Sequence, residues 1–148
     1  MESSSRSRIS ETIETGSVYY FKEKGISSTE PHYFIVLNKN PRTEEFLMLV
    51  CASSQVEKRK RIIKFLGFPE KTLVVVFPSE YPTFTKDSVT DCNRIFEKTI
   101  QSLIEKLEKG QLQPCEALMP KEVVQKLISG ALASNQVSEK VRKMLLGI

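Results

Sequence analysis

The sequences GSVYYF at residues 16–21 and PHYFIVLN at residues 31–38 decide the fold. Both are rich in aromatic and β-branched residues and are bounded by glycine, proline or asparagine, which predicts two β-strands. The segment between them is polar and charged and is expected to form a loop. Where this loop enters the second strand stands His32, the only histidine of the chain. Because a strand end combines access with rigidity, His32 is the first candidate for a reactive side chain.

Further strands follow the same pattern. Runs rich in β-forming residues predict strands over Ser17–Lys22, Tyr33–Asn38, Glu45–Ala52 and Thr72–Phe77. Turn residues between positions 38 and 43 join the second and third runs, so these two are expected to pair as a hairpin. Helical spacing predicts a short helix over Gln55–Leu66, with Ser53 or Ser54 as its N-cap. Gly67 is expected to end this helix.

The second half of the chain is mainly helical. Ser88–Phe96 fits a strand, but a helical spacing also runs from Cys92 to Leu107 and closes at Gly110. Helices are expected after Pro120 and over Ser138–Leu146. Strands first and helices last predict a small α+β domain, in which a curled antiparallel sheet is covered by terminal helices.

Length and composition indicate one domain. A chain of 148 residues that is 40% hydrophobic can bury one substantial core. Residues 1–15 are polar and rich in serine, so we expect a flexible or loosely docked arm. No secretory signal or run of membrane-spanning length is found, which predicts a cytoplasmic protein with no membrane contact. The net charge of +4 favours nucleic acid or an acidic protein as partner over a cationic ligand, although a solvated basic surface is the commoner explanation of such a charge.

Several classes of enzyme are excluded by what the sequence lacks. Cys51, Cys92 and Cys115 are widely spaced and form no CxxC or His/Cys cluster, so neither a zinc site nor a disulfide framework is indicated. The chain has no spacing typical of paired catalytic carboxylates, a nucleophilic triad, a glycine-rich phosphate loop or metal ligands. We therefore expect no cofactor and no metal, and exclude ATP-driven, triad-hydrolase and metalloenzyme functions.

Four short motifs follow one another in the sequence. They are Gly16–Tyr19, His32–Asn38, Val50–Gln55 and Lys86–Val89, with Asn93-Arg94-Ile95 a few residues further on. In this order they resemble the MazF/PemK (Kid-like) family of toxins. The resemblance implies an SH3-like barrel over residues 16–112, with residues 113–148 as a helical extension packed on the same domain. It also implies a strand to about Phe96 and a helix from about Thr99 to Lys109.

The resemblance implies a chemistry as well. Members of this family cut single-stranded RNA without a metal, by attack of a ribose 2′-hydroxyl on its own phosphate, so it implies an endoribonuclease that forms a homodimer and is inhibited by an antitoxin protein. Such a reaction needs proton transfer and donors for the charge on the phosphorane. His32 stands where many members carry an arginine, and histidine suits proton transfer. Ser53 stands where they carry a phosphate-facing threonine, so His32 and Ser53 are the expected catalytic residues.

Other residues are candidates for contacts with RNA. The basic or amide and hydroxyl side chains that we assign to RNA binding are Lys22, Lys24, Ser54, Lys58, Arg59, Asn93 and Arg94. The basic run from position 58 could bind successive phosphates, but consecutive residues point around a helix, so a solvated surface is an equal alternative. Helix capping is the alternative for the serines, and an exposed charged loop for the first two lysines.

Two rival functions stay open. The arginine, the proline that follows it and the threonine of the family are all replaced here, which also fits a catalytically inactive barrel that binds RNA or protein. A toxin of the same barrel class that acts on a protein such as a topoisomerase would contact its partner through Ser138–Leu146.

Overall fold

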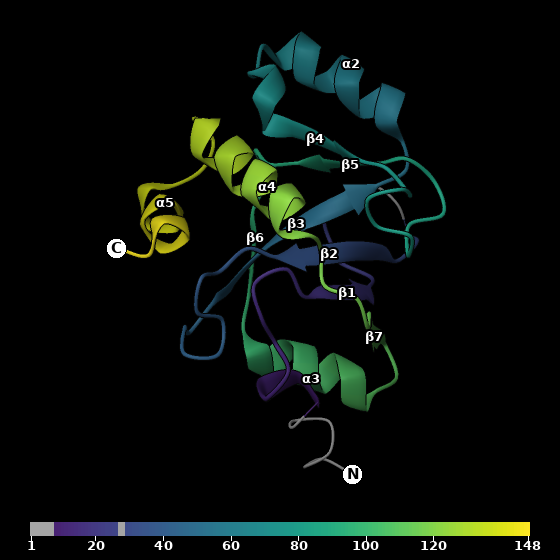
Figure 1. The fold of residues 1–148 in the computed structure, drawn as a ribbon, viewed down its shortest axis with the longest axis vertical. Helices are drawn as coiled ribbons and strands as arrows, with labels where there is room; N and C mark the ends of the chain where they lie inside the picture. The colour runs from purple at the N-terminus through teal and green to yellow at the C-terminus, as the bar shows by residue number, and fades with distance from the viewer. Residues whose placement is uncertain (1–7, 27–28) are drawn as a thin grey trace.

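The computed structural model describes residues 8–26 and 29–148. In chain order, its elements are β1 (Val18–Phe21), β2 (His32–Val36), β3 (Leu47–Ser53), α2 (Val56–Leu66), η1 (Glu70–Thr72), β4 (Leu73–Val76), β5 (Ser88–Asp91), β6 (Phe96–Lys98), α3 (Ile100–Glu108), β7 (Leu112–Pro114), α4 (Lys121–Ala133) and α5 (Glu139–Leu146) (Figure 1). All pairings among the described strands are antiparallel. The expected α+β class is therefore confirmed.

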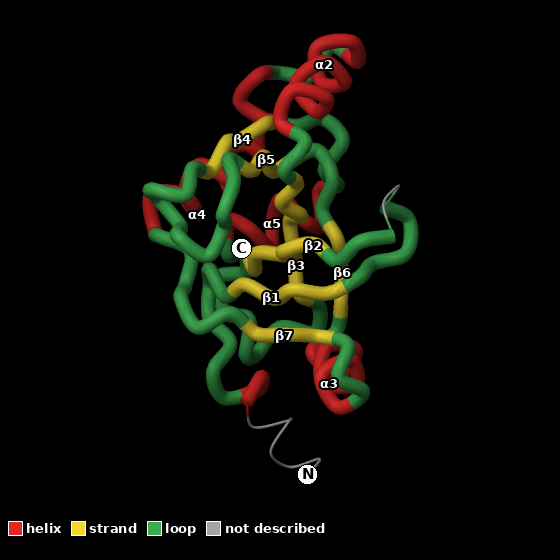
Figure 2. Tube along the Cα trace, turned by 90° about the vertical axis from the view of Figure 1, so that its right-hand side faces the viewer, coloured by secondary structure: helices red, strands yellow, loops and turns green. Residues whose placement is uncertain are grey.

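The sheet is built around β3. Its strand order is β4-β5-β3-β2-β1-β7, with β6 as an additional partner of β3. One edge of β3 pairs with β2, while the opposite edge pairs with β6 through Leu47–Leu49 and with β5 through Ala52 and Ser53. The sheet is open, because β4 and β7 lie at its two ends. Figure 2 shows β2, β1 and β7 side by side, with α3 beyond β7 and α2 at the far end beyond β4 and β5.

Both faces of the central strands are covered, which explains their near-continuous apolar sequence. Alternate side chains of a strand point to opposite faces. Ile35 and Val50 pack in one buried cluster with α4 and α5, whereas Phe34 and Leu49 pack in a second cluster with α3. Each of these four side chains is fully buried. The fold thus holds two apolar layers, one on each side of the β2–β3 pair.

The N-terminal segment is more ordered than the sequence indicated. Residues 1–7 of the expected flexible arm lie outside the described residues. Ile9 and Ile13, however, are fully buried in the cluster that holds Phe34 and Leu103. The Arg42 guanidinium also donates a hydrogen bond to the Ile13 carbonyl at 2.9 Å. The chain therefore packs on the core already at Ile9 and Ile13, because two isoleucines four positions apart on one helical turn reach the same apolar layer.

Most other elements match their expected ranges. The β2–β3 hairpin is confirmed, with Tyr33 opposite Ala52. The strand expected over residues 88–96 is divided into β5 and β6, because the chain crosses from one end of β3 to the other between them. Strand β7 was not predicted. It has three residues, one of them Pro114, and exists through its pairing with β1 rather than through a sequence pattern.

The C-terminal helices pack on the sheet. Leu127 and Ala131 of α4 and Val141 of α5 belong to the same buried cluster as Val50. Pro120 is the N-cap of α4 rather than its first residue, and the Ser138 hydroxyl caps α5 by accepting a hydrogen bond from the Val141 N–H. None of the helices in the described part of the chain is both long and apolar enough to cross a membrane.

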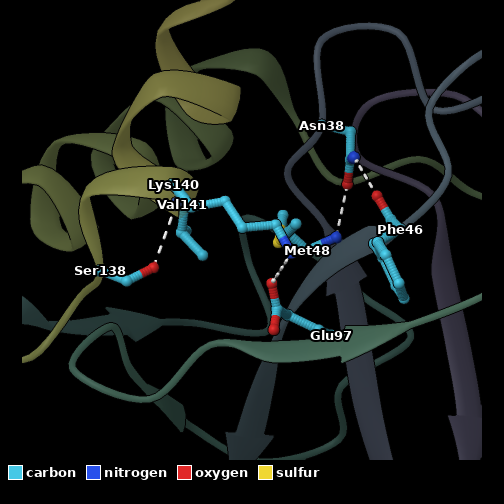
Figure 3. A network of polar contacts seen from close by, with 7 residues as sticks. All are labelled: Asn38, Phe46, Met48, Glu97, Ser138, Lys140 and Val141. Atoms are coloured by element: carbon cyan, nitrogen blue, oxygen red, sulfur yellow. Dashed lines mark hydrogen bonds and ion pairs between the residues drawn. The ribbon is translucent and has the colours of Figure 1, made fainter.

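A buried asparagine closes the β2–β3 hairpin. The Asn38 amide donates to the Phe46 carbonyl at 2.9 Å, and its oxygen accepts from the Met48 N–H at 2.6 Å (Figure 3). Helix α5 meets the sheet close by, where Lys140 pairs with Glu97 at 3.5 Å and lies over the Phe46 ring. Asn38 is completely buried, so these two hydrogen bonds replace water for its side-chain amide, for the Phe46 carbonyl and for the Met48 N–H.

We expect Asn38→Ala to lower the free energy of unfolding by about 1–3 kcal/mol, because it leaves the Phe46 carbonyl and the Met48 N–H without their partner in the protein interior. Urea unfolding followed by circular dichroism measures the change. Asn135→Ala is the matched control, since Asn135 is exposed. Equal stability of the two variants would show that the hairpin does not depend on this side chain.

Candidate functional site

The ends of three strands bring the candidate residues together. Because Tyr33 pairs with Ala52, the next step of the β2–β3 register places His32 opposite Ser53. Ser53 in turn pairs with Val89 of β5. Side chains of paired residues point to the same face, as do those two positions apart along a strand. His32 and Ser53 therefore share one face at the end of the sheet, in line with the second apolar layer.

Two adjoining hollows lie at this end of the sheet. The smaller one, of about 50 Å³, is lined by Ile26, His32, Cys51, Ser53, Arg59, Val89, Asp91, Arg94 and Phe96. The larger one, of about 520 Å³, shares His32, Ser53 and Arg59 with it and extends to Lys58, Lys86 and the Tyr33 and Phe84 rings. We call the larger one the strand-end cavity. Its volume lies within the range of about 300–1,000 Å³ that is usual for small-ligand sites.

His32 is oriented by a backbone contact. Its Nδ1 lies 3.0 Å from the Glu30 carbonyl oxygen, and the ring is half-buried. Because a carbonyl only accepts hydrogen bonds, this contact places the proton of the neutral ring on Nδ1 and the lone pair on Nε2. Such an imidazole can accept a proton from a bound hydroxyl group.

Ser53 and Ser54 do not form the expected N-cap of α2. Gln55 occupies that position and makes no capping hydrogen bond with its side chain. The Ser53 Oγ instead accepts a hydrogen bond from the Gln55 N–H at 3.2 Å, at the turn between β3 and α2. This contact uses the oxygen of Ser53 and leaves its hydroxyl proton able to reach an acceptor in the cavity. Ser54 is exposed and lines the same cavity.

The two arginines of the site have different roles. Arg59, on the first turn of α2, is half-buried and lines both hollows. Arg94 donates a hydrogen bond to the Gly25 carbonyl at 3.0 Å, and its guanidinium lies 4.5 Å from the centre of the Phe96 ring. Arg94 therefore fastens the loop after β1 to the segment before β6. Arg59 is the better placed of the two to meet an anion in the strand-end cavity.

Cys51 contributes no nucleophile. Burial raises the pKa of its thiol from 9.0 to about 12, because the thiolate would lose its hydration, and the opposing influence of Arg59 and Arg94 is smaller. The group stays protonated near neutral pH. A cysteine of this kind is chemically inert, so it belongs to the wall of the smaller hollow.

Three predicted RNA-binding residues line neither of these two hollows. Lys22 and Lys24 line a third hollow of about 1170 Å³, together with Lys98 and Lys106, between the loop after β1, α3 and β7. This third hollow shares Tyr20, Ile26 and Pro31 with the strand-end cavity. The Asn93 amide donates to Thr72 at 2.8 Å and to Asp91 at 2.9 Å, and its oxygen accepts from the Ser134 hydroxyl at 2.6 Å. Asn93 thus joins the segment after β5 to the end of α4, and it lines neither hollow of the site.

The cavity also contains residues that the sequence did not single out. Lys86 and Thr85 reach it from the loop before β5, and Glu30 reaches it from the loop before β2. Lys86 stands at the start of a quoted motif, which was the available signal. Among residues 8–26 and 29–148, no three His, Cys, Asp or Glu side chains are grouped so that they could hold a metal ion.

No protein-family model matches the chain, and no curated protein matches it. The chemistry of the site is therefore inferred from its own residues.

We expect buried thiols to make the stability of the protein depend on alkaline pH. The pKa of Cys51 and that of Cys92 are raised by burial from 9.0 to about 12. Between these values the unfolded chain loses thiol protons that the folded chain keeps, so the free energy of unfolding falls as the pH rises through this window. We expect urea unfolding to show lower stability at about pH 10.5 than at about pH 8, with a smaller fall in Cys51→Ala.

A fall of the same size in wild type and Cys51→Ala would contradict the burial of that thiol. Tyr19 and Tyr81, whose pKa values burial raises to about 12, lower the stability of both proteins at high pH and act as a common background.

Proposed function

We propose that the protein is an endoribonuclease of MazF/PemK type, with an SH3-like barrel, that cuts single-stranded RNA without a metal. The observation that carries this proposal is the meeting of His32 and Ser53 on one face of the sheet, at a cavity of about 520 Å³ that Arg59 also lines. A proton acceptor, a hydroxyl donor and a fixed cation are the groups that attack of a 2′-hydroxyl on its phosphate requires.

Each group takes one role in the reaction. His32 Nε2 accepts the proton of the ribose 2′-hydroxyl as its oxygen forms a bond to phosphorus. Ser53 and Arg59 donate hydrogen bonds to the phosphoryl oxygens, where negative charge builds up. The bond between phosphorus and the 5′-oxygen then breaks, and this oxygen takes a proton from water in the open cavity. The hydroxide formed takes the proton held on His32 Nε2, which regenerates the neutral ring and the water molecule. The products are a 2′,3′-cyclic phosphate and a 5′-hydroxyl.

The surroundings of the cavity fit a polyanionic substrate. Lys58 and Lys86 lie on its wall beside Arg59. The half-buried Tyr33 ring lies at the same wall, packed against the buried Phe84 ring at 5.0 Å, and offers apolar surface to a base. As the resemblance implies, we further propose a cytoplasmic homodimer whose cavity is covered by an antitoxin protein. An acidic segment of that protein would complement the same cations.

Cleavage of single-stranded RNA in the presence of a chelator tests this function. Wild-type protein should produce fragments that end in a cyclic phosphate, detected by electrophoresis and mass spectrometry. His32→Ala should lower the cleavage rate by about 10²–10⁴-fold, because it removes the proton acceptor. Ser53→Ala should also slow cleavage, and Ser53→Thr should restore it by returning the hydroxyl.

Lys109→Ala, an exposed change at the end of α3, serves as the control and should cleave at the wild-type rate. The nuclease proposal fails if the wild type leaves RNA intact, or if His32→Ala cleaves as fast as the control.

A barrel that binds RNA without cutting it is the second candidate. The observation in its favour is Arg94, whose guanidinium is engaged by the Gly25 carbonyl and the Phe96 ring instead of facing the strand-end cavity. Binding that weakens with salt and gives no products would support it. The protein-directed toxin gains no such support, because Val141 and Leu145 on the apolar face of α5 are buried within the core.

A further inference from the structure

Helix α2 is basic and stands out from the sheet. It carries Lys58, Arg59, Lys60, Arg61 and Lys64, against the single acidic residue Glu57. Ile63 is its only buried residue. Figure 1 shows the helix at the end of the molecule beyond β4 and β5, with its first turn next to the end of β3. The beginning of α2 therefore lies at the strand-end cavity, and its far end extends away from it.

One face of α2 continues the wall of the cavity. Lys58, Arg61 and Phe65 are spaced three and four residues apart, so their side chains lie along the same face of the helix. All three are exposed, and Phe65 is 89% exposed. Lys58 lines the strand-end cavity itself. Since a helix rises 1.5 Å per residue, this face runs for about 10 Å beyond Lys58.

We propose that this face of α2 is an extension of the RNA site, which binds the nucleotides that flank the cleaved phosphate. The inference rests on the proposed function. Lys58 and Arg61 contact successive phosphates, and the Phe65 ring stacks on a base. Cations that follow a backbone, together with an exposed aromatic ring, are the usual means by which proteins hold single strands. A length of about 10 Å accommodates about three stacked nucleotides at 3.4 Å each.

Other ligands fit this helix less well. A helix that lies in a membrane surface buries a continuous apolar face among the lipids. In α2 the apolar side is turned towards the protein, where Ile63 is buried and Val56 and Ile62 are half-buried, so only Phe65 and Leu66 at its end remain for a lipid. Pairing with a second copy of α2 would place its basic residues against one another. A nucleic-acid strand has phosphates that pair with the basic side chains and bases that stack on the Phe65 ring.

Binding of labelled 2′-O-methyl RNA measures the extension directly, since this RNA has no 2′-hydroxyl to react. Fluorescence anisotropy compares an oligonucleotide of about 3 nucleotides, which fills the cavity, with one of about 12, which reaches α2. We expect Arg61→Ala and Phe65→Ser each to weaken binding of the long strand by about fivefold or more, and to leave the short strand unchanged. Arg61→Ala should also lower the slope of log affinity against log salt by about 0.7.

Matched controls separate this site from general effects. Lys126→Ala removes an exposed lysine of α4, and Ile148→Ser removes a side chain that is 83% exposed. Both controls should bind the long strand as wild type does. Thermal unfolding checks that every variant is folded. Wild-type affinity of Arg61→Ala and Phe65→Ser for the long strand, or an equal loss for both strands, would overturn the proposal.

Further outcomes identify a different ligand. If Phe65→Ser loses binding to phosphatidylserine vesicles but keeps its affinity for RNA, the helix is a lipid-binding element and the proposal is overturned. If Phe65→Ser changes only the oligomeric mass measured by light scattering, this face of α2 is a contact between two copies of the chain, and the proposal is likewise overturned. Absence of RNA cleavage by the wild type would contradict the nuclease proposal alone, because binding of 2′-O-methyl RNA is measured independently. Absence of binding to both the short and the long strand would contradict the nuclease proposal and the proposed extension on α2.

Discussion

The pairing of β3 with three other strands is the constraint on which this structure depends. One edge of β3 is held by β2, and the other is divided between β6 at its start and β5 at its end. Fully buried apolar side chains on both faces of β2 and β3 fix this register, because a slip by one residue would turn each face into the other layer. The same register determines where β2 and β3 end, and so which polar residues meet there.

The position of the candidate site follows from where β2 and β3 end. Along one face, the apolar layer of Phe34 and Leu49 is continued beyond the core by His32, two positions from Phe34, and by Ser53, four positions from Leu49. The backbone supplies the remaining geometry: the Glu30 carbonyl orients the imidazole, and the Gln55 N–H holds the serine oxygen. Rigid strands thus position the reactive groups, while α2 and the loops supply the cations around them.

Sequence reasoning reached those features that depend on local pattern. Turn chemistry and β-rich runs were sufficient for the β2–β3 hairpin, and helical spacing with a terminal glycine was sufficient for the range of α2. The loop-to-strand boundary singled out His32, which lines the strand-end cavity. Sequence reasoning failed where contacts between residues far apart in the chain determine the structure. The strand β7 forms only through its pairing with β1. Ile9 and Ile13 are ordered by packing against α3 and β2. The Asn93 side chain forms hydrogen bonds with Thr72 and Ser134, which lie in two other segments. The spacing of residue types along one sequence carries no information on such long-range contacts.

The claim that a nucleic-acid strand occupies the end of β2 and β3 is tested most directly by nuclear magnetic resonance. Isotope-labelled protein would be titrated with a single-stranded 2′-O-methyl oligonucleotide, and the amide shifts would be followed residue by residue. Our account predicts shifts at His32, Ser53 and Arg59 that continue along α2. Shifts confined to residues of the third hollow that do not line the strand-end cavity, such as Lys22 and Lys98, or no shifts at all, would contradict it.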